Sequence, residues 1–256
     1  MPKVILTGRV FPACYQISFS SNPLDWRWEE ENLTLRFDVR IEESIVTAEC
    51  TLDRFRPEYF VEIYRRAFDI IRSAVNLAAF SSGIGYSVIL ERFIDSNGRE
   101  TMVAPQNLSL AALCKSFSLD SQPGKISFGK MWDLVVTEPV LFQALDDLIV
   151  SITLPHHAAV NCARAIEGLR HLIAAPGASV SQAWDQMRNA LQLDRSFLQL
   201  ITETSTAPRH GKRSRISGST TTEIVRRSWI IMDRFLEYRK RGNTALPATD
   251  FPVLTV

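Results

Sequence analysis

One short segment of the chain carries the side chains best suited to act on a phosphate. His210 and Gly211 are flanked by the basic residues Arg209, Lys212, Arg213 and Arg215. Imidazole titrates near neutral pH and can accept or donate a proton, while guanidinium groups neutralise a phosphate and the charge that builds up in its transition state. We therefore predict metal-independent cleavage of an RNA phosphodiester, with His210 as the acid/base and Arg209 and Arg213 as phosphate holders. The alternative is a solvated basic loop that contains a histidine by chance.

Positive charge is concentrated in this segment and just after it. Residues 208–241 contain ten Lys/Arg and three Asp/Glu, a local charge of +7 in a chain whose total is +1, so the other residues sum to −6. A nearly neutral chain has no overall affinity for nucleic acid, and any polyanion must be met locally. We expect RNA or a nucleotide to be bound by Lys212, Arg213 and Arg215 in the loop and by Arg226 and Arg227 beyond it.

A long amphipathic helix follows the loop and is predicted to start near Thr220. Thr220 and Glu223 have the spacing of a capping box, and Gly242 provides a left-handed stop. Apolar or small side chains recur at helical spacing between these ends: Ile224, Val225, Ser228, Ile231, Met232, Phe235 and Tyr238. The opposite side is charged, and Glu223 and Glu237 each precede an arginine by four residues, the favourable order for a surface ion pair.

The first 120 residues have the pattern of an antiparallel sheet with one long helix. Apolar and polar residues alternate from Leu33 to Glu42, and a β-rich segment follows, so residues 33–52 are predicted to form a hairpin. Further strands are predicted at residues 3–11, 15–19 and 86–94. The predicted helix runs from Pro57 to about Ser81 and is apolar over most of its circumference, which requires the sheet and a second element to cover it.

Two tryptophans lie in the predicted loop before the hairpin, Trp26 and Trp28, with Arg27 between them. Exposed indole rings can stack on bases or on a partner surface. Tryptophans in such positions more often close the end of a sheet, and this structural interpretation is favoured.

Helices replace strands beyond a polar, turn-forming segment at residues 120–125. Predicted helices cover 137–152 and 158–174, another begins at Ser179 or Ser181, another at Asp194, and the long final helix completes a bundle of about five. The chain is thus predicted to be an α+β protein with domains at 1–120 and 121–256. An extended tail is expected from Leu246.

Length and composition exclude several classes of protein. A chain of 256 residues with 46% hydrophobic residues can bury a sizeable core. The four cysteines are widely spaced, without the C-x-x-C pairs of zinc or dithiol sites, and His156 and His157 have no Asp, Glu or Cys arranged with them. The start lacks the layout of a signal peptide, and no apolar run approaches the roughly 20 residues of a spanning helix. We expect a cytoplasmic protein with no metal, no cofactor and no membrane contact.

A helical bundle with an Arg-His-Gly run before its last long helix resembles the HEPN superfamily (higher eukaryotes and prokaryotes nucleotide-binding). The resemblance covers residues 137–241 and implies RNA or nucleotide binding, a homodimer, and a metal-independent endoribonuclease of a bacterial toxin or anti-phage defence system. The superfamily's signature has an arginine separated from the histidine by four to six intervening residues, whereas here Arg209 adjoins His210. Arg164 and His171 have the formal spacing inside a helical pattern, where a structural role is the favoured interpretation.

A second hypothesis is non-catalytic. The bundle would dimerise and its basic surface would dock an acidic protein partner, or the sheet would sense a small ligand. The residues show no Gly-x-Ser-x-Gly, Walker loop or assembled triad that would indicate another reaction. A homodimer or a protein partner is expected under this hypothesis as well.

Overall fold

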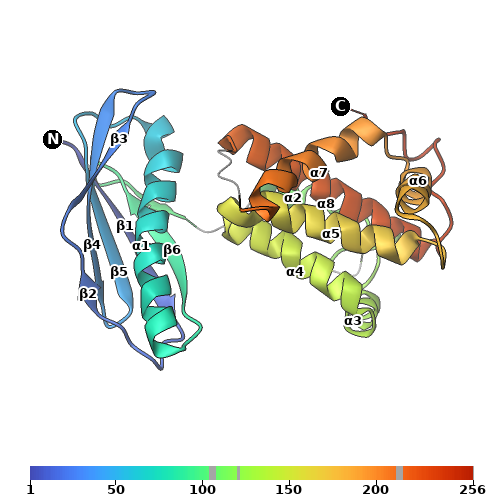
Figure 1. Ribbon diagram of the computed structural model, residues 1–256, viewed down its shortest axis with the longest axis horizontal. Coiled ribbons are helices and arrows are strands. Elements are labelled where there is room, and N and C mark those ends of the chain that lie inside the picture. The colour runs from blue at the N-terminus through green and yellow to red at the C-terminus, as the bar shows by residue number, and fades with distance from the viewer. Residues whose placement is uncertain (104–107, 120–121, 212–215, 256) are drawn as a thin grey trace. The chain divides into compact units, whose positions relative to one another are not determined.

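The chain is an α+β protein that divides into two compact units (Figure 1). The computed structural model describes residues 1–103, 108–119, 122–211 and 216–255. The units are residues 1–106 and 107–256, whereas composition predicted a boundary at 120/121. Residues 108–119 belong with the helices because Leu110 is part of the helical core, and because the backbone N–H groups of Lys115 and Ser116 both donate to Asp233 at 2.8 Å.

The first unit is a seven-stranded antiparallel sheet with one helix across a face. Its strands are β1 (Lys3–Phe11), β2 (Phe19–Ser20), β3 (Leu24–Trp28), β4 (Leu33–Glu42), β5 (Ile45–Thr51), β6 (Ser87–Ile94) and β7 (Glu100–Met102). Their order is β2-β4-β5-β1-β6-β7, and β3 also pairs with β4. The predicted hairpin is confirmed, with Glu42 opposite Ile45. Alternation along β4 buries its apolar side chains on one face and leaves its polar side chains on the other.

Gly8 permits a close approach between β1 and β6. The register of this pair shifts between Thr7 and Gly8. A Cβ atom at residue 8 would lie 2.1 Å from the carbonyl oxygen of Ile89. Only glycine fits this irregularity, because any larger residue would push the two strands apart.

The predicted long helix is confirmed. A short 3₁₀ helix, η1 (Pro57–Tyr59), leads into α1 (Phe60–Ser82), which ends at Gly83 with a φ of 68°. Five side chains of α1 are buried: Ile63, Ala67, Phe68, Ile71 and Val75. Leu77 and Phe80 are 71% and 90% exposed, so the second covering element expected from the apolar pattern is not found over these two side chains in the described residues.

Trp26 and Trp28 lie in β3 and not in a loop. The guanidinium of Arg66 on α1 lies 4.1 Å from the ring centroid of Trp26, and the ring of Trp28 meets that of Tyr59 edge-on at 5.1 Å. The two indoles therefore close one end of the sheet against α1 and η1, as the structural interpretation expected.

The second unit is a helical assembly around α5. Its helices are α2 (Leu108–Ala111), α3 (Phe128–Thr137), α4 (Pro139–Thr153), η2 (Pro155–His157), α5 (Ala158–Ile173), α6 (Val180–Leu191), α7 (Arg195–Arg209) and α8 (Gly218–Lys240). Small residues on α5 let its neighbours approach closely: a Cβ atom at Gly168 would lie 3.3 Å from the side chain of Val140. α5 packs against α4, α6, α7 and α8, which makes it the centre of the core.

Helix caps confirm two predicted starts and correct a third. Ser179 forms a capping box with Gln182 at the start of α6, and Asp194 caps α7. At α8 the predicted box of Thr220 and Glu223 is wrong, because the helix starts one turn earlier. Ser217 is the cap, and its hydroxyl accepts the backbone N–H of Thr220 at 3.1 Å.

The C-terminal segment packs against the junction of α6 and α7, although the sequence predicted an extended tail. Leu246 is buried, and its N–H donates to the carbonyl of Ala190. Leu254 donates to the carbonyl of Gln192 and accepts from the N–H of Asp194. The tail therefore completes the second unit.

Candidate functional site

The predicted catalytic histidine lies at the end of α7. His210 is the C-cap residue; its backbone N–H donates to the carbonyls of Thr206 and Ala207, and the residue is exposed. Gly211 follows with a φ of 66°, a left-handed conformation that glycine adopts without strain. α7 therefore ends in an imidazole that a ligand can reach.

The start of α8 lies just beyond this histidine in the chain. Lys212, Arg213 and Arg215, which were predicted to bind nucleic acid, lie outside the described residues. The first backbone N–H groups of a helix have no partner within the helix and carry partial positive charge, so those of Gly218 and Ser219 can bind an anion. We refer to the described residues on either side of residues 212–215, namely 210–211 after α7 and 216–217 before α8, as the α7–α8 turn.

Arg209, the second predicted catalytic residue, forms an ion pair with a carboxylate of the chain itself. Its Nη1 donates to Oε1 of Glu167 on α5 at 2.8 Å, and both side chains are partly exposed. A phosphate that used this donor would have to displace the carboxylate or share the guanidinium with it. Sequence reasoning did not find Glu167, because nothing in the pattern of α5 links it to a residue 42 positions away.

The two adjacent arginines of α8 differ in their surroundings. Arg226 is half exposed and lies 3.4 Å from the carboxylate of Glu223. The side chain of Arg227 is only 8% exposed; it donates to Glu223 at 2.8 Å and to the backbone carbonyl of Phe197 at 3.2 Å, with its guanidinium over the Phe197 ring. In this structure Arg226 is accessible to a phosphate, whereas Arg227 joins α8 to α7.

Arg227 is the first of three arginines at seven-residue spacing that we call the arginine row: Arg227, Arg234 and Arg241. Arg234 is buried and donates to the backbone carbonyls of Leu191, Gln192 and Pro252 at 2.7–2.9 Å. The first two carbonyls belong to the last residue and the C-cap of α6, where no helical N–H is available to them. Burial lowers the pKa of Arg234, although neighbouring Asp233 counteracts this effect.

Arg241 ends the arginine row at the C-terminus of α8. Its Nε donates to Glu237 at 2.8 Å, its guanidinium lies over the ring of Phe251, and it lies 3.8 Å from Asp250. Burial tends to raise the pKa of Glu237, but hydrogen bonds from Arg241 and Lys240 outweigh it and lower the pKa. The side of α8 expected to be solvated is therefore largely an internal seam.

The formal Arg-x6-His pair of α5 is engaged elsewhere. Arg164 lies 3.4 Å from the carboxylate of Asp147 on α4. Burial raises the pKa of Asp147, although Arg164 counteracts this effect. His171 is exposed, with its Nε2 3.2 Å from an Nη of Arg170. These contacts fit the structural interpretation of both residues.

Two further searches cover the described part of the chain. Residues 1–103, 108–119, 122–211 and 216–255 contain no group of three or more His, Cys, Asp or Glu side chains placed to hold a metal ion. Over the same ranges, no helix has the length and hydropathy to cross a bilayer.

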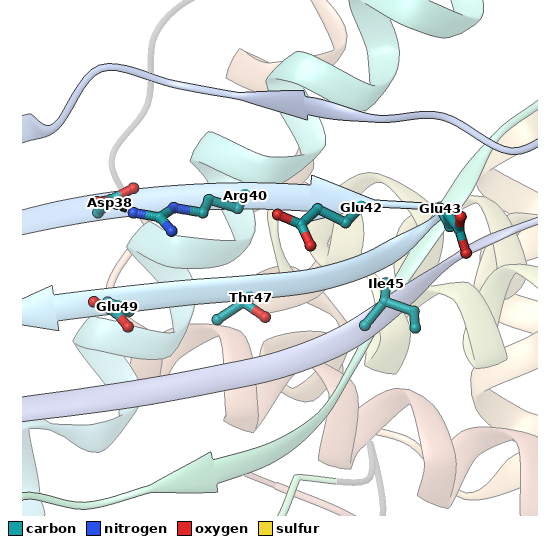
Figure 2. A pocket seen from close by; sticks show the side chains of 7 residues that line it. All are labelled: Asp38, Arg40, Glu42, Glu43, Ile45, Thr47 and Glu49. Carbon is teal, nitrogen blue, oxygen red and sulfur yellow. Dashed lines mark hydrogen bonds and ion pairs between the residues drawn. The ribbon is translucent and has the colours of Figure 1, made fainter.

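The sheet carries a shallow hollow on the face that α1 does not cover (Figure 2). It is lined by Asp38, Arg40, Glu42, Glu43, Ile45, Thr47 and Glu49. Arg40 lies 3.4 Å from Asp38, and Lys3 lies 2.5 Å from Glu49. Four carboxylates around one guanidinium disfavour a phosphate, so the hollow is a poor site for RNA.

Comparisons with known proteins place both halves of the chain in one family. Residues 4–104 match the N-terminal domain, and residues 128–240 the C-terminal domain, of a domain of unknown function, DUF8168. No curated protein and no solved structure matches the chain. Neither family description refers to the HEPN superfamily, so that resemblance stays a prediction. Because the two matches together cover well over half of its length, the chain belongs to the DUF8168 family.

Proposed function

We propose that this is a cytoplasmic RNA-binding protein that holds phosphates at the α7–α8 turn. One observation carries the proposal: the exposed His210 at the end of α7 and the start of α8 bracket the segment that contains Lys212, Arg213 and Arg215. Phosphate is bound well by cationic side chains together with the N-terminus of a helix. The remainder of the +7 stretch supports the proposal less, because Arg227 and Arg234 are buried within the unit and Arg241 is paired with Glu237.

Cleavage of the bound RNA is the catalytic extension of this proposal. His210 would take the proton of a ribose 2′-hydroxyl while that oxygen forms a bond to phosphorus and the bond from phosphorus to O5′ breaks. The products are a 2′,3′-cyclic phosphate and a 5′-hydroxyl, whose proton comes from water. The resemblance to the HEPN superfamily supports this chemistry and a role in a bacterial toxin or anti-phage defence system.

Binding is tested by titrating a labelled single-stranded RNA of about 20 nucleotides at several salt concentrations, a length that spans more than one binding site. Each phosphate contact on a single strand contributes about 0.7 to the slope of log K against log salt, so replacing Lys212, Arg213 and Arg215 with serine should reduce the slope by about 2. The matched control replaces Arg72, Arg99 and Lys130 with serine. Equal losses in the two triple variants, or no RNA binding by the wild type at low salt, would refute the proposal.

Cleavage is tested on a mixed RNA pool with the wild type and His210→Ala. We expect products with cyclic phosphate ends from the wild type and none from His210→Ala, while His171→Ala cuts as the wild type does. If the wild type binds RNA without cutting it, the catalytic extension is wrong and the binding proposal stands.

A second candidate function is self-association, supported by exposed apolar side chains on α3 and α4. Phe128, Trp132 and Val136 on α3 and Phe142 and Ile149 on α4 are each 46–62% exposed. Clusters of large exposed apolar side chains are typical of protein interfaces. We propose a homodimer through these helices, as the non-catalytic hypothesis expected.

The self-association proposal is tested by measuring the mass of the protein in solution. We expect a dimer for the wild type and a monomer for Trp132→Lys combined with Phe142→Lys. Lys130→Glu, an exposed change on the same helix, should leave the dimer intact. A monomeric wild type at high protein concentration would rule out this second candidate.

A further inference from the structure

The outer side of α1 carries large apolar side chains that no described part of the chain covers. Phe80 is 90% exposed, Leu77 71% and Val61 58%, although the apolar pattern of this helix predicts a second covering element. The helix begins at Phe60 and ends at Ser82, so Val61 and Phe80 lie at its two ends. Large exposed apolar side chains are typical of contacts with another molecule.

The two ends belong to a set of six residues at helical spacing, which we call the outer stripe of α1. Its members are Val61, Arg65, Asp69, Arg72, Asn76 and Phe80. The intervals between them are four, four, three, four and four residues, which keeps all six on one side of the helix. These intervals are the same when counted from either end. A second copy of the stripe that runs in the opposite direction therefore matches it position by position.

An antiparallel pair of α1 helices brings unlike charges together at its centre. When the twofold axis passes between residues 70 and 71, Asp69 lies opposite Arg72 of the second copy, and Arg72 lies opposite its Asp69. Arg72 is partly exposed and forms no ion pair with the described residues. Asp69 lies 3.9 Å from Arg66, and because a carboxylate accepts several donors, this contact does not prevent a second.

The same register also matches the ends and the intermediate positions of the stripe. Val61 lies opposite Phe80 of the second copy, so an aliphatic side chain covers each exposed aromatic ring. Arg65 lies opposite Asn76, whose amide oxygen can accept from a guanidinium. Leu77, three residues before Phe80, flanks this contact. One register therefore pairs the apolar and the polar members together.

The outer stripe is too small to hold two chains together by itself. A standard protein interface involves about 20–30 residues on each side, whereas the stripe consists of six. In the self-association proposed above, α3 and α4 already join two copies of the second unit. The two first units then belong to one dimer, and the effective concentration of one α1 for the other rises to about millimolar. A contact that is too weak to join free chains can form under this condition.

We propose that α1 of one copy packs antiparallel on α1 of a second copy, through the outer stripe, within the dimer formed by α3 and α4. This inference rests on the second candidate function, and it names the covering element that the apolar pattern of α1 predicts. The partner is a second copy of this chain because the central charges of the stripe, Asp69 and Arg72, are complementary to those of the same stripe reversed.

The test is cross-linking between cysteines introduced at matching positions of the full chain. Cys14→Ser and Cys114→Ser first remove the native thiols that are not buried. One preparation then carries Arg65→Cys and another carries Asn76→Cys, and the two are mixed. We expect a cross-linked dimer only in the mixture. Residues 65 and 76 are about 17 Å apart along a helix, so neither meets its own counterpart in this register.

Charge reversals test the pairing at the centre of the stripe. In the mixed sample, Asp69→Arg or Arg72→Asp on both chains should slow cross-linking roughly fivefold, because twofold symmetry makes each reversal act on two ion pairs. The two reversals combined restore unlike pairs and should return the rate to its original value. Arg99→Asp is the matched control, since Arg99 is an exposed arginine of the same unit outside α1, and it should leave the rate unchanged.

The outcomes separate this inference from the self-association on which it rests. If the wild type is a dimer but the mixture forms no cross-link, or if Arg65→Cys links to itself as fast as the mixture does, the α1 pair is refuted and the dimer stands. A cross-link that persists in Trp132→Lys combined with Phe142→Lys would refute the second candidate function and leave the α1 pair standing. If the wild type is a monomer at high protein concentration, both fail.

Discussion

Arginine side chains have opposite roles in the arginine row and at the end of α7. Arg234 in the row is 7% exposed and donates to three backbone carbonyls. Arg209 beside the turn is partly exposed and holds a single carboxylate. Both residues contribute to the same local charge of +7. The row stabilises the packing of helices, whereas Arg209 and His210 at the end of α7 lie where a ligand can reach them.

This difference shows what a concentration of arginine does and does not indicate. A guanidinium has five N–H donors and can satisfy several carbonyls at the end of a helix, where helical partners are missing. Charge in a sequence is therefore a sign of a polyanion site only after such internal acceptors have been accounted for. In this chain they account for Arg227 and Arg234, and Arg226 remains accessible.

The largest expected effect is the loss of stability when Arg234 is removed. Arg234→Met approximates the length of the side chain but removes the charged donor from three carbonyls at the junction of α6, α7 and the tail, of which that of Gln192 keeps the N–H of Leu254. We expect the free energy of unfolding to fall by about 3 kcal/mol, because hydrogen bonds from charged donors contribute about 1.5–3 kcal/mol each and are not additive. Urea denaturation of the full chain measures this change.

Arg226→Met is the matched control for Arg234→Met. It should change the free energy of unfolding by less than about 0.5 kcal/mol, as exposed substitutions usually do. Hydrogen exchange adds a local test, since the backbone N–H groups of Asp194 and Leu254 should exchange faster in Arg234→Met only. Equal urea midpoints for the two variants would show that the arginine row does not hold this junction.

A smaller effect separates the adjacent residues Arg226 and Arg227. Arg227→Gln should lower the free energy of unfolding by about 2 kcal/mol, because a nearly buried charged donor loses its bonds to Glu223 and Phe197. Its RNA salt slope should equal that of the wild type. Arg226→Gln should keep its stability and reduce the slope by up to about 0.7, the contribution of one phosphate on a single strand.

The sequence had placed both residues in the nucleic-acid-binding set. A reduced salt slope in Arg227→Gln, measured under conditions where the variant is folded, would return Arg227 to that set. Unchanged slopes in both variants would confine RNA binding to the α7–α8 turn and Arg209.

Periodicity predicted most elements of the fold correctly. The alternation from Leu33 to Glu42 predicted the first strand of the hairpin, and the apolar patterns after Pro57 and Ala158 predicted α1 and α5. Such patterns predict helices and strands because one face of each element is buried, so its apolar side chains recur at the period of that element. The sequence also predicted Asp194 as a cap residue and left Ser179 and Ser181 as alternatives for another, of which Ser179 is the cap; such predictions succeed because a cap bonds only within its own first turn.

Tertiary partners of charged residues could not be predicted in this way. Arg209 pairs with Glu167 across 42 positions, and Arg234 reaches carbonyls 42 and 43 positions before it. No repeating pattern records such contacts, because they depend on how the helices pack. The same limit explains the tail, whose contacts with Ala190 and Gln192 are made by backbone groups that every sequence contains.

Removing the N-cap of α8 should lower the free energy of unfolding by about 1 kcal/mol. Ser217→Ala removes the hydroxyl that accepts the N–H of Thr220, and loss of such a cap typically lowers stability by about 1 kcal/mol. Thr220→Ala should have a smaller effect, because the Thr220 hydroxyl touches Ser217 but caps no N–H in this structure. Thermal unfolding measures both variants. A larger loss in Thr220→Ala would support the capping box that the sequence favoured.

The smallest expected effect concerns Asp147, a buried carboxylate beside the exposed Arg164. Burial raises its pKa above the ordinary value of 3.8, so the folded state binds this proton more tightly than the unfolded state does. The wild type therefore loses stability as pH rises through the raised pKa of Asp147. Asp147→Asn avoids this loss and should be more stable than the wild type at pH 7. The difference in the free energy of unfolding should shrink as the pH falls towards 3.8, the ordinary pKa of an aspartate.

Asp146→Asn is the comparison for this pH dependence, since Asp146 is the exposed neighbour of Asp147 on α4 and its charge adds to the effect of burial on the pKa of Asp147. Thermal unfolding between acidic and neutral pH should show a narrowing gap between Asp147→Asn and the wild type, and a smaller gap of the same direction for Asp146→Asn, because burial is the larger cause. A gap of constant size across this range would mean that the amide gains hydrogen bonds of its own. In that case the carboxylate of Asp147 behaves as an accessible carboxylate does. The cost of burying a charged side chain in the second unit would then be smaller than the contrast between the buried Arg234 and the partly exposed Arg209 implies.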